Sequence, residues 1–258
     1  MKALLVDFEA TGIDASKERA TEIGALVTSL DFTQVHDSLS VLMHDSSYPE
    51  ITPEVEKVTG ITQDLLDKEA VHPLAGYSKL GELVTDEVVV AVAFNKSYDE
   101  TLYKAELSRL ASYTPGMHRL NMLPWVCAMV DVESNYQFKS WKLSHLALEY
   151  KVPVDPNKLH RAINDCELMR VMLVAAGISA TDMLKYAAEP WVIAVAMCKK
   201  PWDDGGASTG IAKELGFGWQ TAKGDPDKKV YTNRWVKRIK LKQFEQLAAH
   251  PTLEIRLL

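Results

Sequence analysis

The order of short apolar segments and amphipathic segments constrains the fold of this 258-residue chain more than any other sequence feature. Residues 3–9 form a short apolar run that ends in carboxylates, as expected of a buried central strand. Residues 22–30 and 35–43 are rich in β-branched side chains and partly alternate, which predicts an antiparallel meander with the first strand. Strand and helix signals alternate after it, so we expect an α/β layer fold with a mixed sheet.

Helical spacing identifies the segments that would cover this sheet. Residues 88–94 are a continuous apolar run typical of a buried strand, and residues 97–111 carry apolar side chains on one helical face. Further helices are predicted at residues 53–58, 63–68, 72–83, 141–150 and 166–176.

The sequence changes in character after Gly177. Residues 181–198 are predicted to be helical, although Pro190 should break or start a helix there. The last segment offers a short helix, a strand and a terminal helix. We therefore expect a large domain over residues 1–180, a connecting helix over 181–198 and a small α+β domain over 199–258.

Charge is unevenly distributed along the chain, whose formal net charge is −6. Residues 199–258 contain 12 Lys and Arg against 7 Asp and Glu, which leaves 17 of the 29 basic and 28 of the 35 acidic residues in the remainder. An acidic body that holds cations, joined to a basic domain, is compatible with a nucleic-acid enzyme. An uneven solvated surface would give the same counts.

Composition predicts a cytoplasmic globular protein without a membrane segment. Hydrophobic residues make up 47% and charged residues 25% of the chain, which is ordinary for a globular domain. The most apolar runs, residues 88–94 and 191–198, are far shorter than the roughly 18 residues of a membrane span. Carboxylates interrupt the apolar N-terminal run, unlike in a secretory signal. Three widely spaced cysteines without a CxxC pair are expected to be reduced.

Asp7 and Glu9 are the first candidate functional residues. Positions i and i+2 of a strand face the same way, so both carboxylates would project from one side of the sheet. Two carboxylates at the end of an apolar strand are unfavourable unless a cation such as a hard divalent metal offsets their charge. Gly12 would allow another backbone segment or a substrate to approach closely. Taken alone, an acidic strand end is more often simply solvated.

Two further segments place acidic residues where a helix begins. Asp99 lies in the first turn of the helix that follows residues 88–94, where an acid also favours the helix dipole. His160 lies five residues before Asp165, at the start of the next long helix, so both can reach one pocket. A surface position for His160 and a capping role for Asp165 are the ordinary alternatives.

Together, the stretches DFEATG, FNKSYD and HRAIND resemble, in order and spacing, the motifs of the DnaQ-like DEDD exonucleases of the histidine subgroup. Residues 58–62, VTGIT, resemble a Gly-Ile-Thr segment that these enzymes often carry between the first two motifs. The resemblance covers about residues 1–177. It departs at Phe94, where relatives often have a histidine before the asparagine, and this affects the geometry of the strand end rather than the metal-binding acids.

The resemblance implies a ribonuclease H-like fold, a mixed five-stranded sheet flanked by helices, and metal-dependent 3′→5′ exonuclease activity. It implies two Mg²⁺ ions, replaceable by Mn²⁺, with the ligands Asp7, Glu9, Asp99 and Asp165. His160 would act as general base, completing a catalytic set of five residues. Substrate contacts are expected near the motifs, at Phe8, Ala10, Thr11, Gly12, Asn95 and Tyr98. Ordinary core or helix-start positions are the alternative for Phe8, Asn95 and Tyr98.

The expected partner is a nucleic acid with a free 3′ end. We expect DNA, single-stranded or as a frayed duplex, with release of nucleoside 5′-monophosphates. An RNA exonuclease, or a proofreading or adaptor subunit of a replication complex, is the alternative, and no particular protein partner is indicated.

The C-terminal segment combines aromatic and basic residues. Trp202, Trp219 and Trp235 are interleaved with Lys and Arg and could stack on bases beside phosphate contacts. They could equally form the core that a small domain needs. A stretch from Ala212 is weakly similar to small modules attached to nucleic-acid enzymes. We therefore expect residues 199–258 to be a basic accessory domain that helps to hold substrate.

Overall fold

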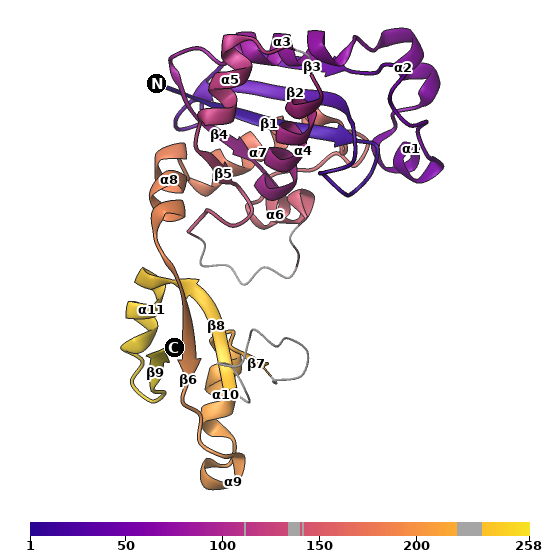
Figure 1. Cartoon of the computed structure of the whole chain (residues 1–258). Coiled ribbons are helices and arrows are strands. Elements are labelled where there is room, and N and C mark those ends of the chain that lie inside the picture. The colour runs from indigo at the N-terminus through magenta and orange to yellow at the C-terminus, as the bar shows by residue number, and fades with distance from the viewer. Residues whose placement is uncertain (111, 134–139, 141, 221–233) are drawn as a thin grey trace. The chain divides into compact units, whose positions relative to one another are not determined.

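The computed structural model describes residues 1–110, 112–133, 140, 142–220 and 234–258 (Figure 1). The chain forms two compact units, Met1–Ala187 and Ala188–Leu258. Each unit has its own sheet and its own core.

The first unit is built on a five-stranded sheet in the order β3-β2-β1-β4-β5. Its strands are β1 (Lys2–Ala10), β2 (Ala20–Ser29), β3 (Val35–Leu42), β4 (Val88–Ala93) and β5 (Trp125–Cys127). β1, β2 and β3 pair antiparallel, whereas β4 pairs parallel with β1 and with β5. This confirms the predicted mixed sheet of five strands, with β1 at its centre.

Helices cover both faces of this sheet because the side chains of β1 alternate between two cores. Leu4 and Val6 pack in a core with residues of α3 (Pro73–Leu83), α4 (Lys96–Arg109) and α5 (Pro115–Met122). Ala3 and Leu5 pack in a second core with α6 (Leu143–Glu149), α7 (Ala162–Ala176) and α8 (Ala180–Ala188). The short helices α1 (Pro53–Thr59) and α2 (Gln63–Glu69) begin at the threonine caps Thr52 and Thr62.

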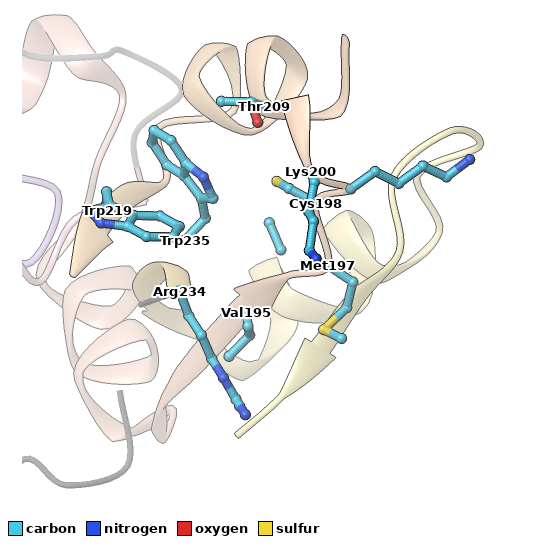
Figure 2. Close-up of a pocket in the computed structure, with 10 residues that line it drawn as sticks. Val195, Met197, Cys198, Lys200, Thr209, Trp219, Arg234 and Trp235 are labelled. Carbon is cyan, nitrogen blue, oxygen red and sulfur yellow. The ribbon is translucent and has the colours of Figure 1, made fainter. Parts of the chain in front are cut away.

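The second unit has a four-stranded antiparallel sheet in the order β7-β8-β6-β9. Its elements are β6 (Trp191–Ala196), α9 (Pro201–Asp204), α10 (Ala207–Glu214), β7 (Gly218–Gln220), β8 (Arg234–Lys240), α11 (Leu241–Ala248) and β9 (Ile255–Leu257). Ala194, Ala212 and Ile239 lie in its small core. A pocket of about 560 Å³ opens on this unit, lined in part by Trp219 and Trp235 (Figure 2).

The predicted connecting helix over residues 181–198 is wrong in its second half. Helix α8 ends at Ala188, and residues Trp191–Ala196 form the central strand β6. Pro190 ends the helical backbone, and β6 then gains antiparallel partners on both sides, β8 and β9. The second unit therefore begins at Ala188 rather than at residue 199.

Among the described residues, no single helix is both long and apolar enough to cross a membrane. Helices α7 and α8 reach that length and apolar composition only when they are taken together, and the chain bends by 83° between them.

Candidate active site

The alternation along β1 also decides where its two carboxylates point. Asp7 and Glu9 continue the face of Ala3 and Leu5, so they project toward the layer that contains α7. They lie at the carboxyl end of β1, beyond Leu5, the last residue that pairs with β4. The predicted common face is therefore present.

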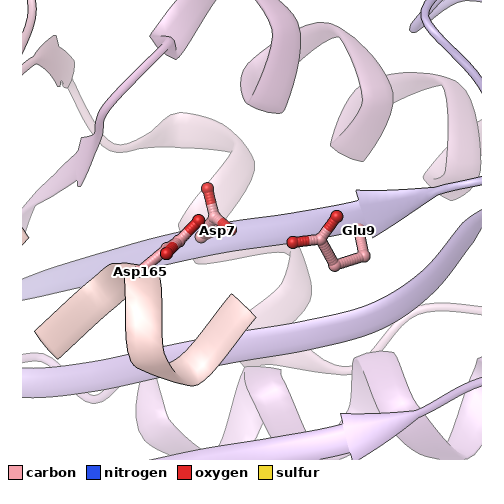
Figure 3. A group of neighbouring side chains, drawn as sticks. All are labelled: Asp7, Glu9 and Asp165. Atoms are coloured by element: carbon pink, nitrogen blue, oxygen red, sulfur yellow. The ribbon is translucent and has the colours of Figure 1, made fainter. Parts of the chain in front are cut away.

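Asp165 joins these two carboxylates from the first turn of α7. One carboxylate oxygen from each of Asp7, Glu9 and Asp165 lies within 4.8 Å of the other two (Figure 3). The three residues come from two elements more than 150 residues apart in the sequence. They form a group of oxygen ligands suited to a hard divalent cation.

The N-terminus of α7 lies directly on β2, beside β1. Gly24 pairs with Asp7 in the sheet, and a Cβ at Gly24 would lie 2.1 Å from the carbonyl carbon of Ala162. Only glycine permits this contact, because the clash would be with backbone and no rotamer could relieve it. Cys166 also donates from Sγ to the Gly24 carbonyl, at 3.3 Å.

Glu22 and Arg161 also join the N-terminus of α7 to β2, at the junction of these two elements. Neither residue was identified from the sequence. Glu22 is fully buried on β2, opposite Glu9. Its carboxylate accepts hydrogen bonds from Arg161 Nη2 at 2.8 Å, from Arg161 Nε at 3.0 Å and from the backbone N–H of Ala162 at 3.1 Å. The available signal was a lone charged residue within a strand of otherwise apolar and small residues, since a buried charge is almost always paired.

Asp99 is buried in the first turn of α4, with 3% of its surface exposed. Burial raises the pKa of Asp99 to about 8, while backbone hydrogen bonds from Phe8, Asp99 itself and Asn95 oppose the rise. The charge of Asp99 raises the pKa of Asp7, so the two carboxylates are neighbours. Asp99 is not part of the close group of three.

The carboxylates of the site strongly disfavour one another's ionisation. Burial, followed by the charges of Asp99 and Glu9, raises the pKa of Asp7 well above its usual range. Burial and the charge of Asp165 raise the pKa of Glu9 to about 8. Asp165 Oδ1 is buried without a hydrogen-bond partner in the described part of the chain. A divalent cation would offset the repulsion and give this oxygen a partner, so the residues present fit a metal.

His160 lies immediately before the junction that Glu22 and Arg161 form. Its backbone has a left-handed φ of 60°, and its side chain is exposed. A backbone hydrogen bond from His160 and its charge both lower the pKa of Asp165, against the larger effect of burial. His160 therefore lies close to Asp165.

Two predicted substrate contacts are core side chains. Phe8 is 5% exposed, and its ring packs against Tyr77 and Tyr103 at centroid distances of 6.4 and 6.3 Å. Ala10 is 8% exposed in the same core. Both occupy even positions of β1 and so face away from Asp7, which removes their side chains from the predicted substrate surface.

The other candidates lie around the loop that follows β1. Thr11 is buried, and its hydroxyl donates to Glu18 at 2.6 Å. A Cβ on Gly12 would lie 2.7 Å from the Glu18 carboxyl carbon. Tyr98 is half-buried and donates from Oη to the Gly12 carbonyl at 2.5 Å. These contacts shape the loop rather than leave free groups.

Asn95 is the most accessible of the predicted substrate contacts. It is exposed at the start of α4 and makes no side-chain cap there. It lines a pocket of about 550 Å³ together with Lys96, Lys104 and Met129. Asp165 borders a separate pocket of about 310 Å³ that Leu159 and Leu168 also line.

Comparison with known proteins places this site in a family. The RNase_T family profile, described as "Exonuclease", matches residues 4–170. The PolC-type DNA polymerase III of Thermotoga maritima is 25% identical over 165 residues, which are 64% of this chain and 11% of that polymerase. The DNA polymerase III subunit epsilon of Treponema pallidum is 28% identical over 170 residues, covering 63% of this chain and 70% of the subunit. The chain thus spans about a tenth of the PolC-type relative.

Solved structures share the fold at low identity. E. coli exonuclease I, in a zinc-bound complex with single-stranded DNA, matches with a TM-score of 0.60 and 13% identity over 93% of this chain and 62% of its own. Exonuclease X in complex with 5′ overhanging duplex DNA matches with a TM-score of 0.51 and 18% identity over 72% of this chain and 99% of its own. The mixed sheet is therefore the ribonuclease H-like sheet of these nucleases. With its acidic motifs and a profile match over residues 4–170, the chain belongs to the DnaQ-like family of 3′→5′ exonucleases.

Proposed function

We propose that this protein removes nucleotides one at a time from the 3′ end of DNA, single-stranded or frayed from a duplex, and releases nucleoside 5′-monophosphates. The observation that carries the proposal is the meeting of Asp7, Glu9 and Asp165 within 4.8 Å, beside the buried Asp99. Such a group of oxygen ligands suits the divalent cations that enzymes use to hydrolyse phosphodiesters. In sites with two ions, the pair stabilises the attacking and the leaving oxygens of an in-line displacement.

The four carboxylates would hold two Mg²⁺ ions, and Mn²⁺ should replace them. The ions would supply charge neutralisation of the phosphate and activation of water. His160 would accept the proton of the attacking water, and its exposed position close to Asp165 supports this role. Asn95 would contact the terminal nucleotide, and its exposure at the start of α4 supports this role.

The relatives support DNA over RNA as the substrate. Both sequence relatives are DNA polymerase III proteins, and the structures of exonuclease I and exonuclease X contain single-stranded and 5′ overhanging duplex DNA, respectively. A proofreading role is the second candidate, favoured by the match to the epsilon subunit over 70% of its length.

The test uses DNA and RNA oligomers of one sequence, labelled at the 5′ end, with Mg²⁺ or with EDTA. We expect a ladder that shortens from the 3′ end of DNA, faster than that of RNA, and no cleavage in EDTA. A 3′-blocked oligomer should resist, and Asp7→Asn should leave DNA intact. Faster loss of RNA would overturn the substrate, and cleavage by Asp7→Asn would place the active site elsewhere.

A further inference from the structure

The second unit presents a pair of tryptophans, one of them exposed, at the pocket of Figure 2. Trp219 of β7 and Trp235 of β8 are partners in the sheet, and their rings meet edge to face with centroids 5.6 Å apart. Trp219 is 51% exposed, and Trp235 is partly buried against the core of the unit. Figure 2 shows both indoles together at one side of the pocket. Trp235 thus holds a half-exposed indole, and an exposed indole can stack on a flat, aromatic ligand.

Cationic side chains lie on and near this pocket. Lys213 Nζ lies 5.7 Å from the centre of the Trp235 ring. Arg234 and Lys199 are exposed and line the pocket, and Arg234 extends from β8 away from the indoles (Figure 2). The described residues that line the pocket include three cationic side chains and no carboxylate. The ligand that fits has both flat rings and negative charge.

The charge of the whole second unit agrees with this. Residues 188–258 have 12 Lys and Arg against 8 Asp and Glu, whereas residues 1–187 have 17 against 27. A polyanion is therefore repelled by the net charge of the unit that holds the acidic site and attracted by that of the other. Residues 221–233 and the side chain of Trp202 lie outside the described residues.

We propose that this pocket binds single-stranded nucleic acid, with a base stacked on Trp219 and neighbouring phosphates paired with Arg234 and Lys199. Stacking on tryptophan accepts any base, and the cations contact the backbone, so binding would be independent of sequence. The role as a holding site for substrate rests on the proposed exonuclease function, but the binding itself does not.

The test measures binding of a fluorescent single-stranded DNA oligomer to the full chain in EDTA, by anisotropy. We expect Trp219→Ala to weaken binding about fivefold or more, because base stacking contributes about 1–3 kcal/mol, and Trp219→Phe to retain most of it. Arg234→Ala should weaken binding and lower the slope of log K against log salt by about one. Arg256→Ala is the matched control, since it removes an exposed cation of the same unit outside the pocket.

Wild-type affinity in both Trp219→Ala and Arg234→Ala, in folded protein with an unchanged Tm, would overturn the pocket while leaving the exonuclease proposal intact. The same variants can also be tested for binding to an acidic peptide. If they lose binding to the peptide but keep binding to the oligomer, the pocket belongs to a protein partner and the proposal is overturned. Conversely, a wild-type chain that binds DNA through the pocket but never shortens it would contradict the proposed function alone.

The contact between Glu22 and Arg161 carries a second, independent inference. Glu22 has no exposed surface, whereas the Arg161 side chain is 38% exposed, and taking the Glu22 carboxylate out of water costs desolvation that the attraction to Arg161 must offset. A contribution to the free energy of unfolding is therefore a weak explanation for the presence of this ion pair. It joins β2, directly beside Asp7 and Glu9, to the residue between His160 and the first turn of α7. The helix supplies no side-chain cap of its own there, and Glu22 accepts the Ala162 N–H in its place.

We infer that Glu22 and Arg161 are positioning residues, which fix His160 and Asp165 relative to Asp7 and Glu9. The Arg161 guanidinium donates from both Nε and Nη2 to Glu22 in a planar fork. It therefore sets the direction of the Arg161 backbone relative to β2 as well as its distance from β2. Gly24, on the same face of β2, brings the helix backbone close enough for the fork to reach. This role rests on the proposed site.

The variants Glu22→Gln and Arg161→Lys test this, because each preserves bulk and loses the paired fork. We expect kcat to fall about 10- to 100-fold, or the Mn²⁺ dissociation constant measured by electron paramagnetic resonance to rise by that factor, with KM for DNA within about twofold. Arg170→Ala is the matched control, since Arg170 pairs with Glu167 on the same helix, away from its N-terminus.

A lowered Tm with unchanged kcat and Mn²⁺ affinity would show a purely structural role and overturn the inference. An equal loss in Arg170→Ala would do the same, because it would show that any weakened contact of α7 suffices. Failure of the proposed function would look different, since the wild-type chain itself would then lack activity.

Discussion

At the scale of single residues, the site holds more negative charge out of water than the surrounding protein neutralises. The charge of Arg161 lowers the pKa of Glu9, but burial and the other carboxylates raise it more. Arg161 is already paired with Glu22. The carboxylates that remain must be protonated or bind cations, and this makes both pH and metal affect folding stability.

The metal-free protein should lose stability as the pH rises. The pKa values of Glu9 and Asp99 are raised from ordinary values of 4.5 and 3.8 to about 8, so the folded chain holds protons that the unfolded chain releases. Their contribution is complete below the unfolded values and is lost as pH rises through about 8. The slope is up to about 1.4 kcal/mol per pH unit for each carboxyl.

Thermal denaturation in EDTA between about pH 5 and pH 8.5 measures this. We expect Tm to fall over that range and Mg²⁺ to restore more of it at the higher pH. Glu9→Gln, which lacks one of these carboxyls, should show a shallower fall. A wild-type Tm that falls with pH in EDTA no more steeply than that of Glu9→Gln would contradict the prediction.

His160→Ala should separate binding from turnover. The imidazole is exposed next to Asp165 and is not part of the carboxylate group, so its removal should leave DNA binding nearly unchanged. We expect kcat to fall about 10²- to 10⁴-fold, the usual contribution of a general base. His145→Ala, an exposed histidine on α6, is the control. Turnover like that of the wild type in His160→Ala would exclude the role.

At the scale of elements, the site is made where three segments end or begin. β1 supplies Asp7 and Glu9 at its carboxyl end, α4 supplies Asp99 in its first turn, and α7 supplies Asp165 in its first turn. The contact between the start of α7 and β2 sets the position of Asp165 relative to Asp7 and Glu9. Because that helix start lies on the backbone of Gly24, a small change there moves a carboxylate by a comparable amount.

Gly24→Ala should therefore damage stability and activity together. The added Cβ would lie 2.1 Å from Ala162 and 2.2 Å from the Ile163 nitrogen, so the helix must move. We expect a loss of about 1–3 kcal/mol in the free energy of unfolding, measured by urea denaturation, with a fall in kcat. Gly210→Ala is the matched control, because no atom lies within 4 Å of its added Cβ. Equal stability of the two variants would refute the close contact.

At the scale of the whole molecule, an acidic unit with the active site is joined to a basic unit. The boundary at Ala188 means that a cut at residue 198 would remove β8 and β9 from β6 and leave that strand unpaired. Any truncation should therefore keep residues 1–187, and should be checked by circular dichroism for a folded sheet.

Deleting residues 188–258 should weaken DNA binding and flatten its dependence on salt, because the segment has 12 of the 29 Lys and Arg. Metal-dependent cleavage of a very short oligomer should change less than cleavage of a long one. The measurement is the slope of log K against log salt for both chains. Equal slopes would assign the second unit a purely structural role.

The sequence by itself determined the central strand, the common face of Asp7 and Glu9, and the order of the motifs that contain Asp99, His160 and Asp165. These depend on periodicity and local composition, which neighbouring residues decide. Only the tertiary structure decided that Glu22 pairs with Arg161, 139 positions away, and that Trp191–Ala196 is a strand rather than the end of a helix. It also showed that the ring of Phe8 is a core side chain. In each case the deciding contact is with a segment distant in sequence, and an apolar run does not encode whether its hydrogen-bond partners lie within a helix or on another strand.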